Sequence, residues 1–197
     1  ATLILFYVAD VIQHPESSGY FLATYFLSGA AGLPLWTRLS AAVGKAQAWC
    51  AAMALSVAAF VWAYMLGAGD VLPFAIVCAL SGIAFGADLA LPASMLADVI
   101  DHDARAGDAR PDGAYFGLWH LLEKLALAIA AGTALPLLDA LGYQPGGTAH
   151  GQGLAALAAV YALLPCAIKI AAAGLLWRAG LDPVRVRTRQ FIHGESQ

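Results

Sequence analysis

The chain has 197 residues, of which 61% are hydrophobic and only 12% are charged, about half the charged fraction of ordinary globular proteins. This balance excludes most soluble folds. The net charge is −3, so no basic surplus is left to neutralise phosphates, and nucleic-acid binding is excluded. The three cysteines lie in apolar stretches without CxxC spacing, which argues against disulfides and structural zinc.

The apolar stretches predict a series of membrane helices. Residues 1–12 form a half-length stretch without the basic start or cleavage site of a signal peptide, so we expect the chain to begin within a longer protein. Backbone polar groups have no water partner in hydrocarbon, so each longer stretch must be a helix of about 20 residues. The five predicted spans are 17–37, 46–68, 71–96, 114–139 and 154–178.

The basic residues predict the orientation of these spans. Lys and Arg are enriched in short loops on the cytoplasmic side of a membrane. Eight of the ten basic residues fall in 38–45, in 98–112 and in the segment from 178 onward, and the other loops hold none. The sequence therefore predicts that these three segments, including the C-terminus, are cytoplasmic.

Four ionic residues fall within predicted spans and away from the span ends, where a central charge costs at least ~2.5 kcal/mol. They are Asp88, Glu123, Lys124 and Lys169. At 1.5 Å per residue, Asp88 and Lys124 lie ~15 Å from the cytoplasmic ends of their helices, close to the bilayer midplane. Secondary transporters keep their substrate sites at this depth.

Helical spacing gathers several of these groups on one helix. Lys124 shares a face with His120, while Trp119 and Glu123 form a second i,i+4 pair. Charged groups for hydrogen bonds and a ring for stacking suit a polyhydroxylated ligand. The structural alternative is that Asp88 and Lys124 merely neutralise each other between helices.

Lys169 has no assigned role at this stage. It lies ~13 Å from Arg178, deeper than snorkelling covers. We expect it to contact a carbonyl group or to pair with another helix.

Residues 98–113 are the densest charge cluster in the chain. Three interpretations are open: a solvated loop, a divalent metal site, or a set of breakable ion pairs between helix ends. The spacing is not that of an EF-hand, which weakens the metal interpretation.

Two runs and a lysine then carry a family resemblance. Residues 92–101 (PASMLADVID), 110–117 (RPDGAYFG) and Lys124 resemble the glycoside-pentoside-hexuronide:cation symporter family, the melibiose-permease-like branch of the major facilitator superfamily. The segment from Gly32 to Lys45 is similar to that family's loop between the eighth and ninth helices. The resemblance covers nearly the whole chain.

The resemblance implies the C-terminal six-helix half of such a transporter, with its first helix truncated. Residues 1–178 would form the bundle and 179–197 a cytoplasmic tail. Lys124 matches a lysine near the sugar, and Asp88, Trp119 and His120 fall at or beside sugar-approaching positions. By motif position, the gating loop contains Asp98, Asp101, Arg110 and Asp112, the last of which replaces the usual Glu.

The resulting hypothesis is a secondary active transporter that couples sugar or glycoside uptake to Na⁺ or H⁺ by alternating access. The coupling ion would be bound mainly by an N-terminal half, and no other cofactor is expected. Two alternatives stay open: a non-transporting membrane sensor or degenerate half-transporter, and an intramembrane enzyme. The enzyme lacks support because GxSxG and HExxH are both absent. The expected location is the bacterial inner membrane.

Overall fold

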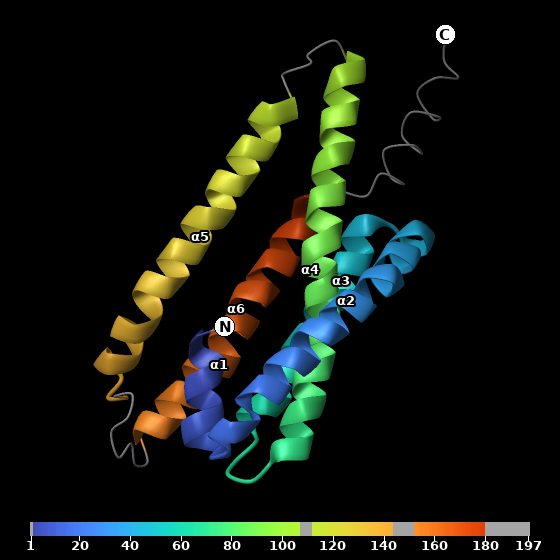
Figure 1. Cartoon of the computed structure of the whole chain (residues 1–197). Coiled ribbons are helices and arrows are strands. Elements are labelled where there is room, and N and C mark those ends of the chain that lie inside the picture. The colour runs from blue at the N-terminus through green and yellow to red at the C-terminus, as the bar shows by residue number, and fades with distance from the viewer. Residues whose placement is uncertain (1, 107–111, 144–151, 180–197) are drawn as a thin grey trace.

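The structure is a computed structural model that describes residues 2–106, 112–143 and 152–179. Nearly all of these residues are helical, and the described part of the chain contains no strand (Figure 1). The elements are, in chain order, α1 (Thr2–Phe6), the π-helix η1 (Tyr7–Ile12), the 3-10 helix η2 (Pro15–Ser17), α2 (Ser18–Val43), α3 (Lys45–Tyr64), α4 (Val71–Ala106), α5 (Asp112–Ala140) and α6 (Gln152–Ala179).

Five long helices occupy the positions predicted for five spans, and four of them are long and apolar enough to cross a membrane. These four are α3, α4, α5 and α6. Helix α2 is 26 residues long but is not among them, because glycine, serine, threonine and tyrosine interrupt its apolar residues. The span predicted at 17–37 is confirmed as a helix and stays a prediction as a span.

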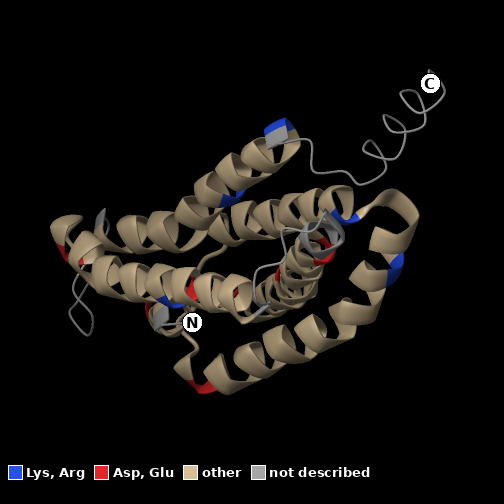
Figure 2. Ribbon diagram, turned by 90° about the horizontal axis from the view of Figure 1, so that it is seen from above, with Lys and Arg blue, Asp and Glu red and all other residues tan. Residues whose placement is uncertain are grey.

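Figure 2 shows that charged residues are sparse along these helices. Most of the ribbon carries neither an acidic nor a basic side chain, as a lipid-facing protein requires. The all-α membrane architecture predicted from the sequence is therefore confirmed.

Helix α4 differs from its predicted bounds, because it continues ten residues beyond the predicted end at 96. Neither glycine nor proline occurs between Pro92 and Gly107, and alanine is frequent there, so nothing in that stretch ends the helix. The expected inter-helix loop thus begins later than predicted. Asp98 and Asp101 lie on the helix rather than in a loop.

Helices α2 and α4 pack closely along a seam of small residues. Gly29 and Gly32 of α2 lie against Gly82 and Gly86 of α4, and all four are buried. The indole Nε1 of Trp36 donates a hydrogen bond of 2.7 Å to the carbonyl oxygen of Ile83 across the same seam. Small residues let two backbones approach where apolar lipid provides no hydrophobic drive for helix association.

An aromatic cluster joins the beginning of the chain to the bundle. The ring of Tyr7 stacks on Tyr161 of α6, with centroids 4.4 Å apart, and on Phe74 of α4 at 5.4 Å. Its hydroxyl donates a hydrogen bond of 2.5 Å to the carbonyl oxygen of Ala63 in α3. Tyr7 is fully buried and contacts three different helices, so it fixes η1 against them.

Helix α5 stands apart from the other long helices over most of its length (Figure 1). Only 6% of its span is buried, compared with 56% of the span of α4. Among the described side chains of α5, Leu138 alone is fully buried, in a cluster with Tyr143 and Leu157. The helix is therefore anchored mainly at its C-terminal end and packs only lightly elsewhere in the described chain.

Candidate functional site

The candidate solute-binding residues of α5 form an exposed polar stripe. The carboxylate of Glu123 lies 3.2 Å from Nδ1 of His120, as the i,i+3 spacing allows. Lys124 is exposed beside them, and Trp119 is partly buried. The contact between His120 and Glu123 joins the two i,i+4 pairs that the spacing predicts, His120 with Lys124 and Trp119 with Glu123.

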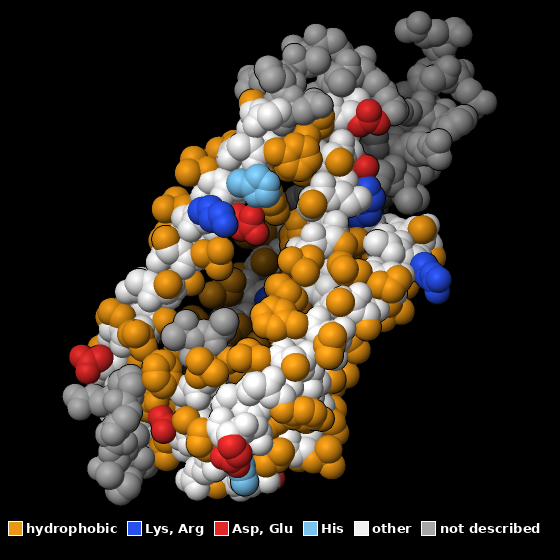
Figure 3. Space-filling model, viewed as in Figure 1, with side chains coloured by type: hydrophobic (Ala, Val, Ile, Leu, Met, Phe, Trp, Pro, Cys, Tyr) orange, Lys and Arg blue, Asp and Glu red, His pale blue; other side chains and the backbone are white. Residues whose placement is uncertain are grey.

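This stripe borders a hollow. In Figure 3, basic, acidic and histidine side chains gather on α5, next to a depression between this helix and the rest of the molecule. The surrounding surface is mostly apolar. Helix α5 thus presents its ionic groups where the described helices leave space for a small solute or for other polypeptide.

Asp88 lies in the middle of α4 and has two partners on other helices. One carboxylate oxygen, Oδ1, accepts a hydrogen bond of 2.9 Å from the indole Nε1 of Trp49 in α3. The other, Oδ2, lies 2.7 Å from the ammonium Nζ of Lys169 in α6. The cation that neutralises Asp88 here is Lys169, and the alternative pairing with Lys124 is not what the structure contains.

The same contact gives Lys169 the role that the sequence left open. Of the two possibilities, a carbonyl contact and a pairing with another helix, the second is confirmed. Trp49 was not anticipated as a partner. The available signal was its depth, one turn into α3, but an isolated sequence does not show which helices adjoin.

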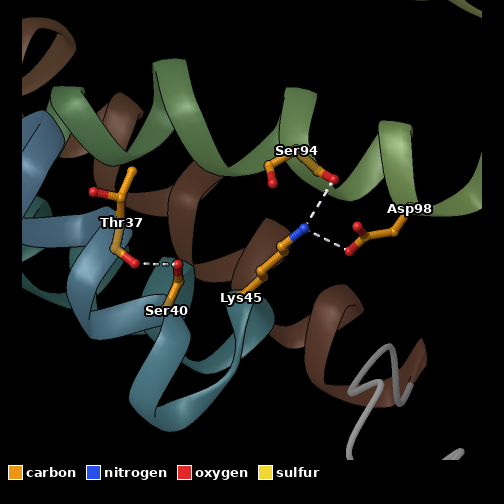
Figure 4. A network of polar contacts seen from close by, with 5 residues as sticks. All are labelled: Thr37, Ser40, Lys45, Ser94 and Asp98. Atoms are coloured by element: carbon orange, nitrogen blue, oxygen red, sulfur yellow. Dashed lines mark hydrogen bonds and ion pairs between the residues drawn. The ribbon is translucent and has the colours of Figure 1, made fainter.

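A second polar contact joins α3 and α4 at their predicted cytoplasmic ends (Figure 4). Nζ of Lys45 lies 2.6 Å from Oδ2 of Asp98 and donates a hydrogen bond of 3.1 Å to the backbone carbonyl of Ser94. The side chains of Lys45 and Asp98 are 26% and 54% exposed, so water screens the pair in part. Of the predicted gating residues, Asp98 therefore has a partner on another helix.

The structure describes the remaining gating residues only in part. Asp101 is exposed on α4, and Asp112 is the first residue of α5. Arg110 lies outside the described residues. No group of three or more His, Cys, Asp or Glu residues that could hold a metal ion occurs in the described ranges.

A polar contact that the sequence did not predict lies at the opposite end of the molecule. The hydroxyl of Tyr143, just after α5, donates a hydrogen bond to Oδ2 of Asp10 in η1. Burial, followed by the hydrogen bond and the charge of Asp10, raises the pKa of this hydroxyl. The contact ties the C-terminal end of α5 to the first turns of the chain.

The comparison with known families agrees with the membrane-helix architecture described above. The family profile described as MFS/sugar transport protein matches residues 1–183, more than nine-tenths of the chain. The chain belongs to this family. No curated protein is significantly similar to the chain. Membership of the MFS sugar transport family points to a transporter rather than an enzyme.

As a member of the MFS sugar transport family, the chain has a lipid bilayer as its surroundings. An apolar groove of about 700 Å³ between α3 and α6 fits this setting, because it is lined by Met53, Val57, Val61, Ile170 and similar side chains. Lys169 lines the groove as well, and its ammonium is directed to Asp88.

Proposed function

We propose that this chain is the C-terminal half of a melibiose-permease-like symporter that moves a sugar or glycoside together with Na⁺ or H⁺ by alternating access. The observation that carries the proposal is the polar stripe of His120, Glu123 and Lys124 on an otherwise apolar membrane helix, beside a hollow. Membership of the MFS sugar transport family supports it.

The energetic argument for a solute passage concerns Lys124. A charge in hydrocarbon is costly, and Lys124 is exposed on the apolar helix α5, so it needs water or a polar solute at its depth. Its ammonium and the carboxylate of Glu123 supply hydrogen-bond groups for sugar hydroxyls, and the Trp119 ring supplies a stacking surface. In this proposal α5 carries the solute contacts.

The gating part of the proposal rests on the contact between helix ends. The Lys45 to Asp98 pair is partly exposed and therefore weak enough to break during a transport cycle. In the proposal, Asp101, Arg110 and Asp112 add further ion pairs at this cytoplasmic end in one conformation only. Such pairs would bias the equilibrium between states by about 1–3 kcal/mol.

The proposed setting is the bacterial inner membrane with the C-terminus in the cytoplasm, as the distribution of basic residues predicts. The proposed partner is the N-terminal half of the same transporter. That half would supply most of the groups that bind the coupling ion. It would also cover the exposed face of α5.

The test of the proposal is uptake of labelled sugars by cells that express the full-length protein. Lys124→Ala should lower uptake at least about tenfold, since hydrogen bonds to charged groups contribute about 1.5–3 kcal/mol. The matched control is Leu125→Ala, the same truncation at an exposed neighbour, which should retain uptake. Equal uptake by both variants at equal surface expression would remove Lys124 from the mechanism.

Ion coupling needs its own measurement. Adding the transported sugar to de-energised cells or proteoliposomes should drive Na⁺ or H⁺ inward, recorded with an ion-selective electrode. Sugar uptake without any ion movement would leave a uniporter and would reject the symport part of the proposal.

A further inference from the structure

Three helices share one carboxylate near the middle of the bundle. Both oxygens of Asp88 on α4 are occupied, one by the Trp49 indole of α3 at 2.9 Å and the other by the Lys169 ammonium of α6 at 2.7 Å. The side chains of Asp88 and Lys169 are 30% and 22% exposed. Neither oxygen is left without a donor from the protein itself.

The position of this contact lets it link helices α4 and α6, which have few other contacts with each other in the described chain. Helix α3 packs extensively against both α4 and α6. Helices α4 and α6 contact each other largely through long side chains: the rings of Phe74 and Tyr161, 6.4 Å apart, and the pair of Asp88 with Lys169 further along. The ion pair is therefore the second attachment between α4 and α6, many residues from the aromatic one.

The electrostatics favour a permanent contact over a transient one. In low dielectric an ion pair with an additional hydrogen bond is held far more strongly than an exposed pair, whereas removing one partner leaves an uncompensated charge. The pair of Asp88 and Lys169 lies within two apolar helices, whereas the pair of Lys45 and Asp98 lies at the predicted cytoplasmic helix ends, where water screens it. The Asp88–Lys169 pair is thus suited to hold helices together, and the Lys45–Asp98 pair is suited to break and re-form.

We propose that Asp88, Lys169 and Trp49 form an intramembrane clamp that joins α3, α4 and α6 into one rigid body, against which α5 moves. Lys169 is a positioning residue for Asp88, and Asp88 acts by holding helices together rather than by contacting solute. The clamp rests on the contacts described above. Only the uptake arm of its test rests on the proposed function.

The first arm of the test is a double-mutant cycle on stability. Asp88→Asn and Lys169→Met each leave one charge within an apolar helix unpaired, while the double variant removes both. We expect each single variant to lower the melting temperature of the full-length protein in detergent micelles and the double variant to regain most of the loss. Additive losses would overturn the clamp.

The second arm separates positioning from solute binding. Each single variant should lower sugar uptake at least about tenfold, and the double variant should recover to within about threefold with an unchanged KM. A double variant that melts normally but stays inactive, or has a strongly raised KM, would overturn the positioning role, because the carboxylate would then be needed by solute or ion. Asp139→Asn, an exposed acid near the end of α5, controls for loss of charge.

The indole has a separate test. Trp49→Phe keeps an aromatic ring but removes the N–H donor to Asp88, and Trp62→Phe is the matched control on the exposed side of α3. We expect Trp49→Phe to lower the melting temperature in the unaltered background and to have little effect when Asp88 is already Leu, a side chain of similar size that has no acceptor for the indole N–H. An equal loss in both backgrounds would exclude the indole from the clamp. If no variant or parent transports sugar, the melting data still decide the clamp while the proposed function fails.

Discussion

The four glycines between α2 and α4 show how single residues set the distance between two helices. A Cβ built on Gly86 would lie 2.6 Å from the carbonyl oxygen of Gly29, and one on Gly82 would lie 2.3 Å from that of Tyr25. These neighbours are backbone atoms, which cannot rotate away as a side chain can. The requirement for glycine is therefore steric and does not depend on an unusual backbone conformation.

Gly86→Ala should separate α2 from α4 and lower the free energy of unfolding by about 1–3 kcal/mol, the usual cost of overpacking. Thermal unfolding in detergent micelles measures this effect. Gly174→Ala in α6 is the matched control, because nothing lies within 4 Å of its built Cβ, and it should change stability by less than about 1 kcal/mol. Equal losses for the two variants would contradict the steric argument.

The depth of the ionic residues within the spans can be predicted from the sequence, but their partners cannot. Depth follows from counting residues along a helix, so Asp88 and Lys169 were placed within the membrane correctly. Partner choice depends on which helices adjoin and on their crossing angles. For this reason Lys124 was considered as the counter-ion of Asp88, while Lys169 and Trp49 occupy that position in the structure.

Among the elements, α5 has the least support from the rest of the described chain. Its apolar surface is exposed, and its main described attachments are Leu138 with its cluster and the hydrogen bond from Tyr143 to Asp10. Gly142, with φ of +82°, ends the helix and directs Tyr143 back to η1. A helix held mainly at one end can pivot there, as the proposed movement of α5 against the clamp requires.

Tyr143→Phe should loosen this attachment by about 1–3 kcal/mol, because the lost hydrogen bond is to a carboxylate. Amide hydrogen exchange around 137–143 should become faster, while Tyr20→Phe, at an exposed tyrosine, should leave it unchanged. The tyrosine pKa is raised in the folded state, so this stabilisation is present below pH 10 and is lost as the pH rises through the raised pKa. Unchanged exchange in Tyr143→Phe would contradict the tether.

The element boundaries were predicted unevenly, for identifiable reasons. The glycine-containing segment after α3 was placed close to its observed position, and α6 was predicted within about two residues because polar turn residues flank it. The end of α4 was wrong by ten residues. Charge was taken there as the sign of a loop, but acidic residues are compatible with a helix that has left the membrane.

For the whole molecule, the all-α membrane architecture was accessible from composition and apolar runs, while the family was indicated by the resemblance of 92–101, 110–117 and Lys124. Long uncharged runs leave helices as the one solution that satisfies the backbone in lipid. The separation of α5 from the other helices was not accessible, because its apolar pattern resembles that of α6 in length and composition. Only the three-dimensional arrangement distinguishes a packed span from an unpacked one.

The orientation of the whole bundle yields a prediction that does not depend on transport. Alkaline phosphatase fused after Gly69 or Tyr143 should be active, because these turns are predicted to lie outside, and inactive after Gly44. Arg38 and Lys45 flank the inactive position. Activity after Gly44 together with inactivity after Gly69 would invert the proposed topology.

The length of α4 has a practical consequence for imaging. Its 36 residues extend about 54 Å, whereas the hydrocarbon core is about 30 Å thick. In the predicted orientation, about 24 Å of continuous helix therefore extends beyond the hydrocarbon core near Asp98 and Asp101. A soluble reporter fused in helical register to this projection would be held at a fixed angle, and could serve as a fiducial for aligning cryo-electron microscopy particles that otherwise lack features outside the micelle.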